Sequence, residues 1–95
     1  MLATGKESKM PEISRFLGII VAMFYNDHVP PHFHARYGEY KVEIAIETLT
    51  ILAGSFPPRA LGLLMEWAAT HRAELMEDWS LARQHAELKR IAPLE

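Results

Sequence analysis

The chain has 95 residues, of which 49% are hydrophobic, and it contains no cysteine. This length suits one domain with a single core, while the lack of cysteine excludes disulfides and thiolate metal sites and favours a reducing, cytoplasmic setting. The formal net charge of −2 argues against strong non-specific binding to nucleic acid, although a local basic strip could still contact it.

Residues 1–9 precede the part of the chain that has a regular apolar pattern. They lack the apolar central region of a signal peptide, so we expect a disordered leader, with Met10 as an alternative start. The longest apolar run, Phe16 to Tyr25, is about half as long as a membrane-spanning helix. We therefore predict a single α+β domain over residues 10–95 and no membrane segment.

A run of β-branched and aromatic residues predicts the first strand. Ile13 to Tyr25 has little alternation, which predicts one strand that is covered on both faces. Asn26 and Asp27 then supply turn chemistry. The prolines at positions 30 and 31 fix φ and remove two backbone donors, which predicts a stiff, extended connector.

The segment from His32 to Ile46 predicts a β-hairpin. Gly38-Glu39 between two tyrosines suits a two-residue type II′ turn, and this turn fixes how the strands pair. The register pairs Tyr37 with Tyr40, Arg36 with Lys41, Ala35 with Val42, His34 with Glu43, and Phe33 with Ile44. Alternation then sorts the side chains into two faces. One face carries Phe33, Ala35, Tyr37, Tyr40, Val42 and Ile44, and the other carries His32, His34, Arg36, Lys41, Glu43 and Glu47.

The second half of the chain predicts a short strand and two helices. Leu49 to Ala53 is the strand, and Gly54 to Pro58 is a helix entrance with Ser55 as the N-cap. Apolar positions predict helices over 60–71 and 74–84, broken near His71, although one longer helix would also fit. Residues 88–94 predict an extended tail that packs on the domain.

Together these elements predict an α+β fold, with an antiparallel meander of three to four strands and two C-terminal helices packed on one face. The helices need the apolar face of the hairpin, so we expect the histidine face to point toward solvent, a groove or a partner. Trp67 and Trp79 are expected in the core. The remaining polar residues of the helical region are expected on a solvated face (Glu74, Glu77 and Asp78) or at helix ends (His71 and His85).

The densest functional signal is the stretch from Asn26 to His34, which holds three of the five histidines. His32 and His34 are two residues apart on one strand face, so their Cα atoms are about 6.5–7 Å apart and both imidazoles can reach one ion. Neutral imidazole is a common ligand of zinc, nickel and iron. With His28 or Asp27 as a third ligand, the stretch could hold a divalent transition metal.

The same side chains allow two other interpretations. His28, His32, His34 and Arg36, near Lys41 and Arg59, are candidate catalytic residues for metal-independent acid–base chemistry on RNA or another phosphodiester. Alternatively, the Pro-Pro-His-Phe-His run is a rigid corner whose imidazoles bond to backbone groups. The residues themselves leave these interpretations open.

Several motifs resemble those of the small bacterial proteins of domain-of-unknown-function family 4160. The most specific is Asn26-Asp27-His28-x-Pro30-Pro31-His32-Phe33-His34. The others are Ile13-Ser14-Arg15-Phe16, Tyr37-Gly38-Glu39-Tyr40, Pro58-Arg59-Ala60-Leu61, Glu66-Trp67, His71-Arg72-x-Glu74-Leu75, Trp79 and Ile91-x-Pro93-Leu94. The resemblance spans Met10 to Leu94.

This resemblance implies a setting for the protein but no established activity and no catalytic residue. Members of the family are often encoded beside another small protein, in an arrangement similar to toxin–antitoxin pairs. The resemblance therefore implies a protein partner, and our leading hypothesis is a small cytoplasmic component of a two-gene, toxin–antitoxin-like module. His28, His32, His34 and Arg36 would form its surface for contact with the partner or RNA. A homo-oligomer is also compatible with the sequence.

Overall fold

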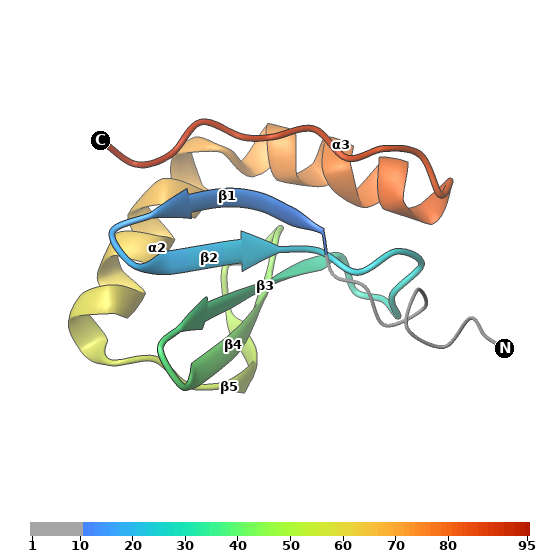
Figure 1. Cartoon of the computed structure of the whole chain (residues 1–95). Coiled ribbons are helices and arrows are strands. Elements are labelled where there is room, and N and C mark those ends of the chain that lie inside the picture. Colours follow the sequence, from blue (N-terminus) through green and yellow to red (C-terminus); the bar gives the residue numbers. More distant parts are fainter. Residues whose placement is uncertain (1–10) are drawn as a thin grey trace, which may run out of the picture.

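A computed structural model describes residues 11–95, so the predicted leader and the alternative start at Met10 lie outside the described residues. Five strands form one antiparallel sheet in the order β1-β2-β3-β4-β5, followed by two helices (Figure 1). The elements are β1 (Glu12–Phe16), β2 (Ile19–Ala22), β3 (His32–Tyr37), β4 (Tyr40–Ala45), β5 (Ile51–Gly54), α2 (Pro58–Thr70) and α3 (Arg72–Arg83). The predicted α+β meander with two C-terminal helices is confirmed, with one strand more than expected.

The additional strand arises because the predicted single strand from Ile13 to Tyr25 is wrong. Leu17 and Gly18, which both have positive φ, turn the chain between β1 and β2. The sequence pattern did not reveal this turn, because Leu17 is apolar and continues the apolar run. In the structure Leu17 is nevertheless 63% exposed. Coverage on both faces is also not observed, since Arg15 on β1 is exposed.

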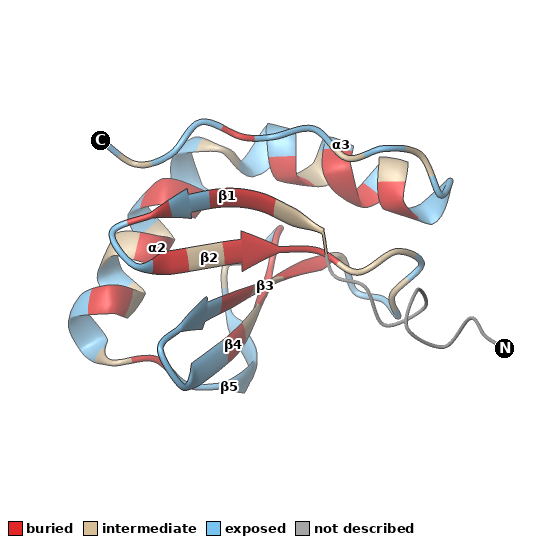
Figure 2. Cartoon of the chain, viewed as in Figure 1, coloured by how far each residue is buried: buried red, intermediate tan, exposed pale blue. Residues whose placement is uncertain are grey.

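The β3–β4 hairpin has the predicted register at every predicted pair, from Tyr37 with Tyr40 to Phe33 with Ile44. Gly38 adopts a φ of 59°, as the first position of a type II′ turn requires. Phe33 and Ile44 are fully buried on the face toward the helices. Figure 2 shows that burial is concentrated on β1, β2 and the inner sides of the helices, while β5 is exposed.

The two helices break at His71, as predicted, and pack their apolar sides on the sheet. Trp67 is fully buried between Phe16 and Phe33, and Trp79 is also buried, which confirms that both tryptophans belong to the core. The predicted N-cap is wrong: α2 begins at Pro58 with Pro57 as the cap residue. Ser55 lies two residues before this cap residue. Its backbone N–H donates to the Lys41 carbonyl and so continues the pairing of β5 with β4. Among residues 11–95, no helix has both the length and the apolar character needed to cross a membrane.

The C-terminal tail packs on the domain, as predicted, and runs past β1 (Figure 1). The backbone N–H of Ile91 donates to the Ile13 carbonyl at 2.8 Å, and the Ser14 hydroxyl donates to the Ile91 carbonyl at 2.9 Å. Trp67 Nε1 also donates to the Ala92 carbonyl. The tail thus covers the β1 edge, and among residues 11–95 no strand pairs with the outer side of β5, which is the open edge of the sheet.

Asp78 contradicts the predicted solvated face, because only 1% of it is exposed. The chain that follows α3 folds back over this residue, and one Asp78 oxygen accepts the backbone N–H of Lys89 at 2.9 Å. Burial raises the pKa of Asp78, and its Oδ2 atom has no hydrogen-bond partner within the described residues. Glu74 and Glu77 are exposed as predicted.

Gly54 provides a test of how β5 joins the sheet. Its φ is +79°, and a Cβ atom there would lie 2.1 Å from the Lys41 carbonyl oxygen. We expect Gly54→Ala to lower the free energy of unfolding by about 2 kcal/mol or more, because the new methyl group forces β5 away from β4. Urea unfolding followed by circular dichroism measures the change.

Gly62→Ala is the matched control, because Gly62 lies in α2 and a Cβ atom added there would have nothing within 4 Å. We expect this variant to raise the free energy of unfolding by about 0.5–1 kcal/mol, since alanine favours a helix interior over glycine. Equal effects in the two variants would contradict the close approach of Gly54 to β4.

Candidate metal centre

The loop between β2 and β3 carries Asp27 and His28 and is held against the end of α3. The backbone N–H of Asn26 donates to the Ala82 carbonyl at 3.3 Å, and Arg83 Nη1 donates to the Asp27 carbonyl at 3.4 Å. Asn26 adopts a positive φ, which asparagine tolerates better than most residues. The loop contains no helix and returns through Pro30 and Pro31, as predicted.

Asp27, His32 and His34 converge at the start of β3. Asp27 Oδ2 is 3.0 Å from His32 Nε2 and 3.0 Å from His34 Nε2. Their ligand atoms all lie within 4.8 Å of one another. The structure therefore brings together three of the four predicted ligands in one compact cluster.

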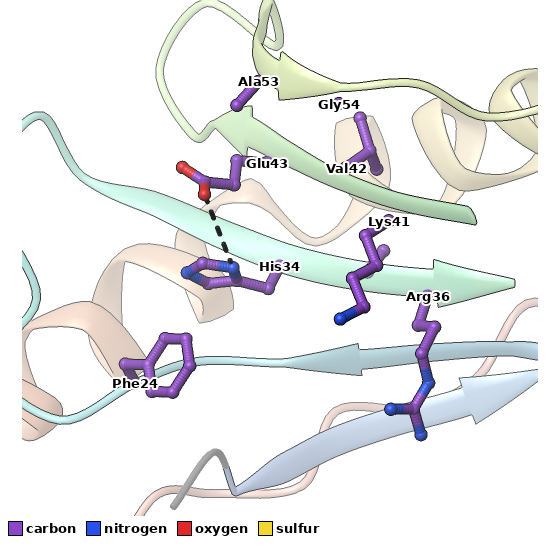
Figure 3. A pocket seen from close by; sticks show the side chains of 9 residues that line it. Phe24, His34, Arg36, Lys41, Val42, Glu43, Ala53 and Gly54 are labelled. Atoms are coloured by element: carbon purple, nitrogen blue, oxygen red, sulfur yellow. Dashed lines mark ion pairs between the residues drawn. The ribbon is translucent and has the colours of Figure 1, made fainter. Parts of the chain in front are cut away.

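The fourth predicted ligand, His28, belongs to an overlapping group with His32 and Glu43. Its Nε2 atom is 3.6 Å from Asp27 Oδ1. Glu43 was not among the predicted ligands, although the predicted register already placed it opposite His34. Glu43 Oε1 is 3.9 Å from His32 Nε2, and its Oε2 is 4.0 Å from His34 Nδ1 (Figure 3).

The cluster is graded from buried to exposed. The side chain of His32 is 0% exposed, those of Asp27 and His34 are 14% and 17% exposed, and that of His28 is 73% exposed. The expectation that the whole histidine face points outward is therefore wrong for His32. Trp79 of α3 covers its ring at a centroid distance of 5.4 Å, since α3 reaches the end of β3 where the loop folds back.

Backbone carbonyls fix which nitrogen of two histidines carries a proton. His32 Nδ1 is 2.7 Å from the Pro30 carbonyl, and His28 Nδ1 is 3.3 Å from the Val29 carbonyl. A carbonyl only accepts, so each Nδ1–H must donate. Each neutral ring then presents its Nε2 lone pair, the usual arrangement in metal sites, where the second ring nitrogen donates to a carbonyl or carboxylate.

The contact between His32 and Asp27 needs a positive charge to be favourable. If His32 is neutral, its Nε2 lone pair faces the Asp27 carboxylate at 3.0 Å and the two acceptors repel each other. A metal ion between the two atoms relieves this repulsion because it accepts a lone pair from each.

Asp27 is ionised and available as a ligand. Burial by itself raises the pKa of this carboxyl group, but hydrogen bonds from His34 and from the His28 backbone N–H outweigh that effect and lower the pKa below its ordinary value. The His28 N–H donates to Asp27 Oδ1 at 2.8 Å, which leaves Oδ2 facing the two imidazoles.

The distances within the cluster are short enough for its donor atoms to share one ion. Two donor atoms that are each about 2.1 Å from an ion lie about 3.4 Å apart at the tetrahedral angle and about 3 Å apart at a right angle. Asp27 Oδ2 lies 3.0 Å from the Nε2 atoms of both His32 and His34, which is also a hydrogen-bond distance. Chemically, the cluster can hold one divalent ion with two imidazoles and one carboxylate.

The other predicted site residues lie outside the cluster. Arg36 is two residues beyond His34 on the same face and lines the adjoining pocket. Arg59 contradicts the expectation that it joins them, because it lines a separate hollow with Leu17 and Tyr37. His71 bonds to Glu74 between the helices and His85 stacks on Tyr25 after α3, which confirms that both are helix-end residues.

A family model described as Domain of unknown function (DUF4160) matches residues 18–80. This range is more than half of the chain and contains the complete Asp27–His34 stretch. The chain belongs to this family. The predicted family is thereby confirmed, and the family match assigns no activity. No curated protein and no solved structure matches the chain.

The buried His32 and the exposed His28 are expected to differ in what they contribute to the free energy of unfolding. We expect His32→Ala to lower the free energy of unfolding by about 2–4 kcal/mol, because it leaves a cavity beneath Trp79 and removes the partner of the Pro30 carbonyl. Urea unfolding measures the effect. His28→Ala is the control and is expected to change stability by less than about 0.5 kcal/mol, since its ring is exposed. Similar values for the two variants would contradict the burial of His32.

Proposed function

We propose that this protein binds one divalent transition metal ion through Asp27, His32 and His34. The observation that supports the proposal most strongly is the orientation of His32. Its Nδ1–H is committed to the Pro30 carbonyl, so its other nitrogen faces the Asp27 carboxylate at 3.0 Å inside the domain. A bound cation resolves the repulsion between these two acceptors.

The ligand set favours ions that accept nitrogen and oxygen together. Two imidazoles and one carboxylate suit zinc, nickel and iron, and the same set with open positions occurs in non-haem iron(II) sites. His28 and Glu43 lie close enough to complete the coordination or to orient a bound water. Three protein ligands leave room for a further molecule, so the proposed centre can support chemistry as well as storage.

Elemental analysis tests this proposal. Protein purified without a histidine tag or chelator is expected to contain about one equivalent of zinc, nickel or iron. The Asp27→Asn variant is expected to lose this metal, because an amide oxygen carries no charge to offset that of the ion. Far-UV circular dichroism checks that the variant stays folded. His34→Ala is a second test variant. It removes one proposed ligand that is partly exposed and leaves the buried side chain of His32 in place.

His85→Ala is the matched control, because His85 lies outside both ligand groups of the described residues. This variant is expected to retain the full equivalent of metal. If the purified protein contains no metal and also fails to bind zinc, nickel or iron(II) on addition, the proposal is wrong. Metal that persists in a folded Asp27→Asn variant would equally contradict it.

The geometry gives less support to metal-independent acid–base chemistry. His32 is buried and both of its nitrogens already face partners, so it cannot contact a substrate. The open pocket is lined by His34, Arg36 and Lys41 from the predicted set, together with Glu43. A nuclease or phosphodiesterase that uses the histidines without metal stays a prediction, and metal-free protein with such activity would favour it.

We also propose, from the family resemblance, that the protein binds a small partner encoded by a neighbouring gene in a toxin–antitoxin-like module. The open β5 edge favours a partner, because Ile51 and Leu52 are both more than 40% exposed there. Co-expression is expected to yield a complex of the two gene products. Leu52→Lys in β5 should weaken it by about tenfold, whereas Leu17→Lys, at an exposed leucine in the turn between β1 and β2, should not. Failure of the two products to co-purify would remove this proposal.

A further inference from the structure

Two like charges face each other on the open side of the sheet. Arg36 on β3 pairs directly with Lys41 on β4, and both side chains are exposed. Like charges at directly opposite positions destabilise a sheet. A pair that is unfavourable for folding suggests a bound anion that offsets the repulsion.

Neither cation has an acidic partner nearby. Within residues 11–95, no carboxylate oxygen lies within 4.0 Å of the charged nitrogens of Arg36 or Lys41, whereas Arg15 on the same face is paired with Glu12 at 2.8 Å. Glu43 also lines this region, but its oxygens lie toward His32 and His34. No carboxylate of residues 11–95 therefore pairs with the positive charge of Arg36 or Lys41.

The pair borders a pocket of about 400 Å³ that also contains His34. Figure 3 shows His34, Lys41 and Arg36 on the same side of the sheet, with the helices behind the strands. Ala53 and Gly54 leave space on the β5 side, and Phe24 closes the other side against the His34 ring. This volume falls in the range of small-molecule sites.

We infer that this pocket binds the phosphate group of a small phosphate monoester, with the phosphate on Arg36 and Lys41 and the rest of the molecule beside His34. The inference deepens the proposed function, because His34 is at once a proposed metal ligand and a wall of the pocket. His34 and Arg36 are two residues apart on one strand face, so a ligand that spans about 7 Å reaches both the phosphate position and the metal.

Charge favours a phosphate monoester over other anions. Two cations match its charge of about −1.5 to −2 at neutral pH, whereas a carboxylate carries only −1. Arginine also matches the oxygens of a phosphate with two parallel hydrogen bonds. RNA fits less well, because a strand is usually bound along an extended basic surface, and the next cation along this face, Arg15, is already neutralised by Glu12.

Titration with inorganic phosphate tests the inference in the metal-free protein. At constant ionic strength, the amide signals of Arg36 and Lys41 in ¹H–¹⁵N spectra are expected to shift and saturate. Arg36→Gln and Lys41→Gln should each weaken binding by about tenfold, because each removes a charge-assisted hydrogen bond. Arg59→Gln removes the same charge from a different hollow and should leave the affinity unchanged. Non-saturable shifts, or equal weakening in all three variants, would overturn the inference.

Two further experiments test whether the ligand is a small phosphate or an RNA strand, and whether a bound metal affects phosphate binding. A single-stranded RNA oligonucleotide without a terminal phosphate is expected to bind more weakly than phosphate, and tighter binding would overturn the small-molecule assignment. One equivalent of zinc should tighten phosphate binding in the wild type but not in Asp27→Asn. If zinc does not bind, only the metal proposal fails, since the metal-free titration stands by itself. If zinc binds without tightening phosphate binding, the placement of the ligand beside the metal is wrong.

Discussion

Burial of Phe33 against Trp67 is the constraint from which the position of the site follows. The two rings meet edge to face at a centroid distance of 6.1 Å, and Phe33 is fully buried. Because side chains alternate along a strand, fixing Phe33 toward the helices turns His34 and Arg36 to the opposite side. A shift of β3 by one residue would turn His34 and Arg36 toward the helices and Phe33 to the opposite side. The free energy of core packing therefore also holds these two side chains on the open face.

The histidine cluster lies where this sheet meets α3, and the two contacts give it unequal surroundings. Trp79 and the returning loop seal His32, while His34 remains at the border of the open pocket. His32 would hold a metal ion firmly, because it is buried and bonded to the Pro30 carbonyl. His34 borders the pocket, so an ion bound there could also contact a second molecule. The rigid Pro30–Pro31 connector contributes by fixing the backbone that carries the carbonyl acceptor.

The open face of the sheet combines this centre with the Arg36–Lys41 pair. On the same described chain, Glu12 is paired with both Arg15 and Arg90, and Lys89 is paired with Glu77. The Glu12 pairs are strong enough to lower the pKa of that carboxyl group to about 2, chiefly through its hydrogen bond with Arg15. Arg36 and Lys41 face each other beside the proposed ligand His34, so imidazoles and positive charge occur together on this face.

The sequence by itself determined the hairpin, its register and its two faces, because alternation and the Gly38 turn are local properties of the chain. It also contained the His-x-His pair and predicted the packed tail and the break at His71, although one longer helix fitted the pattern as well. The β1–β2 turn was missed because Leu17 is apolar, and the burial of His32 and Asp78 was missed because it depends on segments distant in sequence. Only the tertiary structure brought the Asn26–Pro31 loop to Ala82 and Arg83, and thereby set Asp27 between two imidazoles. Such a contact depends on where the end of α3 lies relative to the sheet. The periodicity of the sequence carries no information about the distance between two elements.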